Sequence, residues 1–484
     1  MLFNSLEYFV FLPIMFLLYW FVLGKGLRLQ NVLVLVGSYF FYGLWDWRFL
    51  FLIIASTVVD YFVGIMIHRN EGDRPKQKLW LWASIIFNIS LLGFFKYYNF
   101  FVDSFIDLFE VMGYSIKSTW TLKIILPVGI SFYTFQTMSY SMDVYYKRIK
   151  PCHDFLSFAT FVAFFPQLVA GPIERASNLL HQITNKRTFN YDQIVSGLKL
   201  ILWGLFKKLV IADGIAPIVD DIFLNHETYP ASTLILGVTL FSFQVYGDFS
   251  GYSDIAIGTA KLFGVELMSN FKFPNFSRNV AEYWQRWHIS LSTWFRHYVY
   301  IPLGGSRVSQ GRAIRNICII FLVSGFWHGA NWTFIFWGGF HALAYIPVFL
   351  MGRNTIYKDN VVGENSLFPS LTELGQLVLT FAIVTFSRIF FRSESLTDSF
   401  NFIGRIFSDF SYAPYEHPNG YRMLDYFILL AVFVLYEYRI RRDERNPFQF
   451  KSKAVRFLAY TLVIFTMLLF YDSGFDRSFI YFQF

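Results

Sequence analysis

Charged residues are scarce in this sequence. Aspartate, glutamate, lysine and arginine make up only 15% of its 484 residues, whereas ordinary soluble domains have about 25%. A water-soluble protein of this size needs more charge to cover its surface, yet 55% of these residues are hydrophobic. Apolar runs of membrane length recur from end to end, so the composition excludes a soluble globular protein and predicts an integral membrane protein.

Cysteine and several common site motifs are also rare or missing. Cys152 and Cys318 lie far apart and match no metal-ligand spacing, so we expect neither a disulfide nor a metal site. The sequence has no glycine-rich phosphate loop and no Gly-x-Ser-x-Gly turn. It also lacks a signal-peptide pattern, so we expect the first apolar run to be a retained helix. We therefore predict no bound metal or cofactor.

Basic residues exceed acidic ones, giving a formal net charge of +8. Nucleic acid is one partner that such a charge could suggest. The simpler interpretation is that lysines and arginines lie in cytoplasmic loops, with membrane lipid and no nucleic acid as the surroundings. Basic loops follow the first, third and fifth predicted spans, and the densest basic run, 439–456, precedes the last one. The positive-inside rule then places both termini outside the cytoplasm.

The hydrophobic pattern predicts an all-α, polytopic membrane protein with about eleven spanning helices. We expect one membrane-embedded domain over 1–484, with a catalytic core at about 121–350 and peripheral helices at 1–120 and 370–484. Residues 270–307 are too polar to cross a bilayer, and we predict short helices there that enter it partway. No inverted repeat of the kind common in transporters is visible.

His328 lies in the stretch 325–331, Gly-Phe-Trp-His-Gly-Ala-Asn, inside an apolar run from 317 to 351. This position predicts an imidazole about 15–20 Å from either end of a span, where ionisable side chains face a bundle interior or a wet cavity. Gly325 and Gly329 are expected to leave room for a ligand, and Asn331 is a candidate oxyanion donor. We predict that His328 is a general base; the alternative is a structural histidine bonded to a neighbouring helix.

His288 precedes His328 by 40 residues. Trp284, His288 and Ser292 are spaced by four residues and are expected to line one helical face. With Arg286 nearby, this face predicts an aromatic, positively charged wall for an anionic and partly apolar ligand. The alternative is an interfacial histidine in an aromatic belt. We predict that the two histidines share one site.

Polar side chains also interrupt the apolar run that begins near residue 232. Gln244 and Asp248 are four residues apart, so they share a helical face and are candidate substrate-binding residues. Gly247 and Gly251 form a small-xxx-small pair, which allows another helix to approach closely.

Other ionisable residues in apolar runs have simpler interpretations. Asp60 and Asp254 are expected to lock helices together by hydrogen bonds, and proton coupling is the alternative. Lys207 and Lys208 are adjacent, and we expect them at a membrane interface or in a cavity wall because two lysines at mid-membrane are costly.

Seven sequence blocks resemble the membrane-bound O-acyltransferase (MBOAT) family. The likeness is to the bacterial branch that contains the alginate O-acetyltransferase membrane subunit and the D-alanyl transfer protein of teichoic acid synthesis. The blocks run in family order and are 125–136 (ILPVGISFYTFQ), 165–173 (FPQLVAGPI), 204–213 (GLFKKLVIAD), 246–254 (YGDFSGYSD), 283–296 (YWQRWHISLSTWFR), 300–305 (YIPLGG) and 324–332 (SGFWHGANW).

The resemblance implies a fold and an activity. The fold is a ring of slanted helices around a thinned centre, with a tunnel in which family histidines match His328 and His288. An acyl group arrives on the cytoplasmic side as a thioester, either acetyl-CoA or an acyl carrier. The acceptor is a hydroxyl on the far side. In the alginate-like branch, an extracytoplasmic acetyltransferase partner protein then passes the group to a polysaccharide.

These features predict an O-acyltransferase of the bacterial inner membrane that O-acetylates an exopolysaccharide or a cell-wall polymer. D-alanyl transfer for teichoic acid is the alternative within the family, although 484 residues is longer than we expect for that branch. A transporter or proton channel is an alternative of a different class. The missing inverted repeat and the partly inserted 270–307 segment argue against transport.

Overall fold

The computed structural model describes residues 1–24, 26–114, 120–169, 171–364, 366–418, 420, 423–470 and 479–480. Every regular element within these residues is a helix, which confirms the predicted all-α fold. The chain divides into two compact units, of which unit 1 comprises 1–194, 260–267 and 329–331. Unit 2 comprises 195–259, 268–328 and 332–484. The single-domain organisation stays a prediction.

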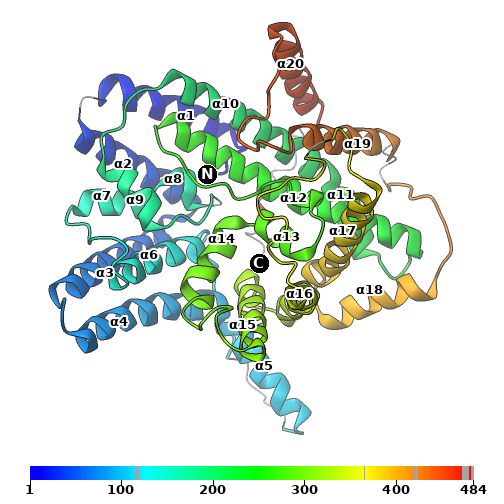
Figure 1. The fold of residues 1–484 in the computed structure, drawn as a ribbon, viewed down its shortest axis with the longest axis horizontal. Helices are drawn as coiled ribbons and strands as arrows, with labels where there is room; N and C mark the ends of the chain where they lie inside the picture. The colour runs from blue at the N-terminus through cyan, green and yellow to red at the C-terminus, as the bar shows by residue number, and fades with distance from the viewer. Residues whose placement is uncertain are drawn as a thin grey trace. The chain divides into compact units, whose positions relative to one another are not determined.

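Unit 1 contains the N-terminal helices, coloured blue to cyan in Figure 1. They are α1 (Leu6–Leu17), η1 (Leu18–Val22), α2 (Leu27–Asp46), η2 (Trp47–Phe49), α3 (Leu50–Arg69), α4 (Arg74–Leu92), η3 (Gly93–Tyr97), α5 (Tyr98–Val111), α6 (Ile130–Tyr145), α7 (Phe155–Val162), α8 (Phe165–Leu168) and α9 (Ala176–Thr184). Three of these helices, α3, α4 and α6, meet around one buried carboxylate.

Asp60 supplies that carboxylate from the middle of α3, where it is fully buried. It accepts hydrogen bonds from Ser84 and Asn88 on α4 and from Ser141 on α6, at 2.8 Å for Asn88 and 2.7 Å for Ser141. A buried carboxylate needs such donors because it has lost its hydration. Asp60 therefore locks three helices together, as the sequence predicted.

Unit 2 contains the remaining helices, coloured from green to red in Figure 1. They are α10 (Tyr191–Phe206), η4 (Lys207–Ala212), α11 (Asp213–Leu224), α12 (Ala231–Leu262), η5 (Pro274–Phe276), α13 (Val280–Arg286), α14 (Ile289–Phe295), η6 (Arg296–Tyr300), α15 (Gln310–His328), α16 (Trp332–Leu350), α17 (Leu371–Arg392), α18 (Leu396–Ser408), α19 (Met423–Ile440) and α20 (Lys453–Phe470). The ends of α10 and α12 extend into unit 1. Residues 270–307 form short helices, as predicted, and their depth in a membrane stays a prediction.

Glycines bring α10 and α12 into close contact. A Cβ atom added to Gly251 would lie 2.7 Å from the carbonyl oxygen of Gly204, and one added to Gly247 would lie 3.1 Å from that of Lys207. Real Cβ atoms essentially never approach as closely as the first of these distances. The small-xxx-small pair therefore works as predicted, and backbone meets backbone between these two helices.

Helices α15 and α16 pack side by side in opposite directions. Gly325 faces Phe334 and Gly338, and a Cβ on Gly325 would lie 3.2 Å from the Cα of Gly338. Two sequence expectations are therefore wrong. His328 ends a helix instead of lying at the middle of one span, and Gly325 makes room for α16 instead of for a ligand.

Five helical stretches of the described chain are long and apolar enough to cross a membrane: Leu27–Arg69, Arg74–Val111, Trp332–Leu350, Leu371–Arg392 and Lys453–Phe470. The predicted number of about eleven spans is thus not confirmed. Shorter apolar helices, Leu6–Val22 and Phe155–Leu168, occupy two of the places where spans were expected.

Candidate active site

His288 lies at a break between α13 and α14. Its backbone has φ 44° and ψ 54°, in the left-handed region, and it caps the start of α14. A residue with a side chain is less stable there by about 1–2 kcal/mol, and such strain clusters at functional sites. Because the helix is interrupted here, Trp284, His288 and Ser292 do not line one helical face, and that prediction is wrong.

Asn270 fixes the orientation and the tautomer of the His288 ring. The Nδ1 atom of His288 lies 3.0 Å from Asn270 Oδ1, which can only accept, so Nδ1 carries the proton. The amide is oriented in turn because Asn270 Nδ2 donates to Ser253 Oγ at 3.1 Å. Ser290 Oγ also donates to Asn270 Oδ1, at 2.9 Å. The neutral His288 ring therefore carries its basic lone pair on Nε2.

His328 lies beside His288, with ring centroids 6.3 Å apart and ring planes inclined at 57°. Aromatic side chains surround the two rings: Trp337 and Phe391 lie 5.1 Å and 5.7 Å from the His328 centroid. Phe249 lies 4.7 Å from the His288 centroid. His288 is 0% exposed, and His328 is 2% exposed. The expected proximity of the two rings is therefore observed, while their catalytic roles stay predictions.

A third histidine, His341 on α16, belongs to the same aromatic cluster. Its Nδ1 accepts a hydrogen bond from Trp284 Nε1 at 3.3 Å, so the proton of the neutral ring is on Nε2. That Nε2 lies 3.0 Å from Ser387 Oγ on α17. Trp284 is thus held against His341, with centroids 5.0 Å apart. His341 was not predicted from the sequence. The signal that could have found it is that His341 is a second ionisable residue, after His328, in the apolar run 317–351.

Arg286 and Asp248 both form ion pairs inside the protein. Arg286 forms an ion pair with Glu282 at 2.9 Å and donates to the carbonyl of Asn360 at 2.7 Å. Asp248 pairs with Lys208 at 2.8 Å and accepts from the backbone N–H of Ile480 at 2.7 Å. The charge of each residue is therefore matched by partners within the protein.

The other predicted site residues lie on helices near the pair or in the segment that follows it. Gln244 precedes Asp248 by one turn on α12, and Ser292 follows His288 by one turn on α14; both are half-buried. Asn331 is half-buried in 329–331, the short segment that groups with unit 1.

The adjacent lysines, expected at a membrane interface or in a cavity wall, are buried inside the protein, and their depth in a membrane stays a prediction. Lys207 and Lys208 are 3% and 1% exposed. Lys207 pairs with Asp254 on α12 at 2.7 Å, and Lys208 pairs with Asp213 and Asp248 at 2.8 Å each. The carboxylates offset the cost of burying the two ammonium groups. The sequence expectation considered each lysine alone and did not include such partners.

No group of three or more His, Cys, Asp or Glu side chains that could hold a metal ion occurs among the described residues. The arrangement around the two histidines instead offers two buried imidazoles in an aromatic enclosure, one of them with a fixed tautomer. Such groups can accept and return protons in a site shielded from water.

Comparisons with known proteins point in the same direction. The model of the membrane-bound O-acyltransferase family matches residues 78–355. The chain is 36% identical to the probable alginate O-acetylase AlgI of Pseudomonas aeruginosa, over 92% of this chain and 82% of that protein. It is also 36% identical to the peptidoglycan O-acetyltransferase of Helicobacter pylori, over 82% of this chain and 78% of that protein. Identity to the teichoic acid D-alanyltransferase of Streptococcus thermophilus is 26%, over 64% and 85%.

Proposed function

Because this chain belongs to the membrane-bound O-acyltransferase family, we propose that it transfers an acetyl group from a cytoplasmic thioester to a hydroxyl on the outer side of the membrane. It is a multi-pass membrane enzyme and an O-acyltransferase. Relatives that are named for O-acetylation of alginate and of peptidoglycan support an exopolysaccharide or a cell-wall polymer as the final acceptor. The buried pair of His288 and His328 carries the proposal.

His328 acts as the general base in this reaction. Its neutral imidazole takes the proton from the acceptor hydroxyl while the hydroxyl oxygen attacks the thioester carbonyl carbon. A C–O bond forms, the C–S bond breaks, and the departing thiolate takes the proton back from the imidazolium. A positioned base of this kind contributes about 10²–10⁴-fold to a rate. Holding the two reactants in line lowers the barrier further.

His288 supports that step through its fixed tautomer. Because Asn270 accepts from Nδ1, the basic nitrogen of the neutral His288 ring is Nε2, and this ring lies beside the ring of His328. The neighbouring basic ring of His288 stabilises the positive charge that His328 acquires when it takes the proton. The aromatic walls exclude water and strengthen this interaction.

The remaining predicted residues are assigned to substrate binding and to shaping the site. Trp284 provides an aromatic wall, Ser292 a hydroxyl and Asn331 an oxyanion donor. Arg286 and Asp248 act through the partners that they hold. Gln244 offers Oε1, which has no hydrogen-bond partner among the described residues.

The topology follows from the positive-inside rule. We place the enzyme in the bacterial inner membrane, with both termini and the acceptor outside and the donor, acetyl-CoA or an acyl carrier, inside. Only the acyl group then crosses the bilayer through a locally thinned centre. An extracytoplasmic acetyltransferase partner or the polymer itself receives the group, and no nucleic acid takes part.

D-alanyl transfer is the alternative within the family. The teichoic acid D-alanyltransferase relative shares 26% identity over 64% of this chain, whereas the acetylating relatives share 36% over more than 80% of it. Acetyl transfer is therefore the better-supported reaction. Transport or proton conduction, the alternative from a different class, predicts flux without any acyl donor.

Reconstituted vesicles test these alternatives together. Purified protein in liposomes receives radiolabelled acetyl-CoA on one side and alginate oligosaccharide or peptidoglycan fragments on the other, with a D-alanyl thioester as the competing donor. We expect labelled ester in the presence of wild type, and none with His328→Ala. His181→Ala, which changes an exposed histidine of α9, is the matched control. Ion or proton flux without ester formation would overturn the proposal.

A further inference from the structure

Unit 1 contains a cavity of about 370 Å³ at the ends of three packed helices. Figure 1 shows these helices, α3, α4 and α6, side by side among the blue and cyan elements. His68 near the end of α3, Glu71 in the turn before α4, and Gln77 in α4 contribute to its lining. Val144 near the end of α6 and the following residues 147–151 also line it. A cavity of this volume is large enough for a ligand.

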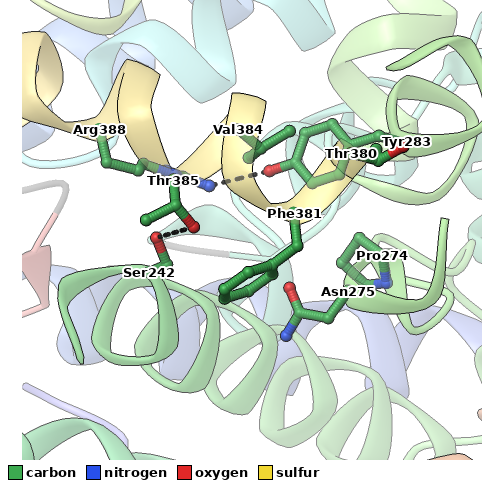
Figure 2. A pocket seen from close by; sticks show the side chains of 9 residues that line it. All are labelled: Ser242, Pro274, Asn275, Tyr283, Thr380, Phe381, Val384, Thr385 and Arg388. Atoms are coloured by element: carbon green, nitrogen blue, oxygen red, sulfur yellow. Dashed lines mark hydrogen bonds between the residues drawn. The ribbon is translucent and has the colours of Figure 1, made fainter. Parts of the chain in front are cut away.

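The space drawn in Figure 2 is much smaller. Nine side chains of unit 2 enclose about 10 Å³ there, which is enough for one water molecule at most. Arg388 of α17 lines this space, and its Nη2 donates to the Tyr283 hydroxyl at 2.9 Å. Its guanidinium also lies over the ring of Trp287, with Cζ 4.4 Å from the centroid. The cavity of unit 1 is therefore the stronger candidate for a ligand site.

Cations outnumber carboxylates in the lining of the unit 1 cavity. The described lining residues include Lys147, Arg148 and Lys150, and Glu71 is the carboxylate among them. Lys147 Nζ donates to a carboxylate oxygen of Glu71, and Arg148 Nη1 donates to Asp143 at 3.0 Å. Lys150 is exposed and makes no ion pair with the residues that the structure describes. The cavity therefore has an excess of positive charge, which favours an anionic ligand.

The backbone turns sharply at Lys147, directly after α6. Its φ is 57°, in the left-handed region where glycine is the usual residue after a helix. The amide of Lys147 donates to the carbonyl of Val144 at 3.0 Å, which closes the helix end. A lysine is strained in this conformation, and its side chain pairs with Glu71 in the turn between α3 and α4. This pair holds together the two segments that line the cavity.

The cavity lies where two membrane-length stretches end. Leu27–Arg69 and Arg74–Val111 are both long and apolar enough to cross a membrane, and Glu71 lies in the connection between them. Phospholipid headgroups occupy this level of a bilayer. Tyr146 is an aromatic residue of the kind common at membrane surfaces, and Arg148 Cζ lies 5.1 Å from its ring centroid. The lining also has apolar residues, which suit the glycerol and first acyl carbons of a lipid: Ile67, Val144, Ile149 and Pro151.

We propose that this cavity binds the phosphate of an anionic phospholipid, with Lys147 and Lys150 as the residues that bind it. An ammonium group has three donors, so Lys147 can keep its bond to Glu71 and still donate to a phosphate oxygen. Clusters of lysine and arginine beside a membrane span are typical sites for anionic lipids. A soluble phosphate compound carries the same charged group, but it does not use the apolar lining. The bound lipid connects the α3–α4 turn to the segment after α6 and so stabilises unit 1.

The first experiment measures stability, independently of acyl transfer. Full-length protein in an uncharged detergent is melted with phosphatidylglycerol, with phosphatidylcholine, with inorganic phosphate and with coenzyme A. We expect phosphatidylglycerol alone to raise the Tm of wild type. A double variant, Lys147→Met with Lys150→Met, should need about tenfold more of this lipid for the same rise, because two phosphate contacts are lost. Replacing both lysines by arginine keeps the charges and should retain most of the effect.

The matched control removes two other lysines from the same end of unit 1. Lys76→Met with Lys78→Met deletes two exposed charges of α4 that do not line the cavity, and this variant should respond to phosphatidylglycerol as wild type does. Lys150→Met alone provides a second test if the double variant does not fold, because Lys150 is exposed.

The second experiment detects the bound lipid by native mass spectrometry of the same proteins. Wild type and the control variant should retain phosphatidylglycerol, and the double variant of the cavity lysines should lose it. An equal loss of lipid in the control variant would assign the effect to general surface charge and overturn the proposal. Equal stabilisation by inorganic phosphate or coenzyme A would identify a soluble phosphate as the ligand and overturn the lipid assignment. An unchanged response of the double variant would show that Lys147 and Lys150 do not bind the lipid.

Discussion

Asn270 provides the sharpest test of the histidine pair, because it touches His288 without belonging to the reacting groups. Asn270→Ala removes the acceptor of the His288 Nδ1 proton, which lies 3.0 Å away, and leaves the backbone bond from Ile289 N–H to the carbonyl of residue 270 in place. The proton can then move to Nε2, and the basic lone pair of the ring moves to Nδ1. Losing one such orienting hydrogen bond costs about 1–3 kcal/mol, which corresponds to a rate loss of roughly 5–150-fold.

The assay is acetyl transfer by reconstituted protein, with kcat and KM measured separately. We expect Asn270→Ala to lower kcat and to leave KM nearly unchanged, because the binding surfaces are retained. Asn270→Asp keeps an acceptor at Oδ1 and should restore part of the rate. Asn225→Ala removes an exposed asparagine that bonds Asp221, so it controls for the loss of an amide. A full rate in Asn270→Ala, or equal losses in the Ala and Asp variants, would refute the tautomer argument.

Two further predictions concern the stability of unit 2. Gly251→Leu forces the α10 and α12 backbones apart and should destabilise the protein by about 1–3 kcal/mol, measured by a melting curve in detergent. The control is Gly375→Ala, which should leave the melting temperature unchanged because a Cβ there meets nothing within 4 Å. Lys208→Met leaves buried carboxylates without a counter-ion and should cost about 3–5 kcal/mol in the same assay, whereas Lys76→Met removes an exposed pair worth at most about 1 kcal/mol. A stable Lys208→Met protein would show that the buried ion pairs contribute little.

The two histidines could be predicted because their surroundings are locally unusual. An imidazole in an apolar run, and a tryptophan-rich stretch too polar to cross lipid, are both visible without any long-range information. The Asp60 cluster was predictable for a similar reason, since a carboxylate in a span needs donors from neighbouring helices. In each case the cost of burying a polar group predicted that the group has a bonding partner. It did not predict which residue that partner is.

The break at His288 could not be predicted, because residues 284–292 contain no proline or glycine and their spacing suits a helix. The Ile289 N–H instead bonds the carbonyl of Asn270 at 2.9 Å, a contact from 19 residues away that replaces an intrahelical bond. Tertiary contacts of this kind override local preference. Lys207 and Arg388 show the same limit, because the environment of each depends on residues from distant helices.

The near-complete burial of both imidazoles also bears on how the enzyme behaves without its acceptor. Under the proposed mechanism, an activated thioester waits beside a base, and water is the most abundant hydroxyl compound in the cell. A site that encloses His288 and His328 in aromatic rings denies solvent the position from which it could attack. The resting enzyme therefore conserves its donor, and hydrolysis of the thioester stays slow until a polymer or partner hydroxyl arrives.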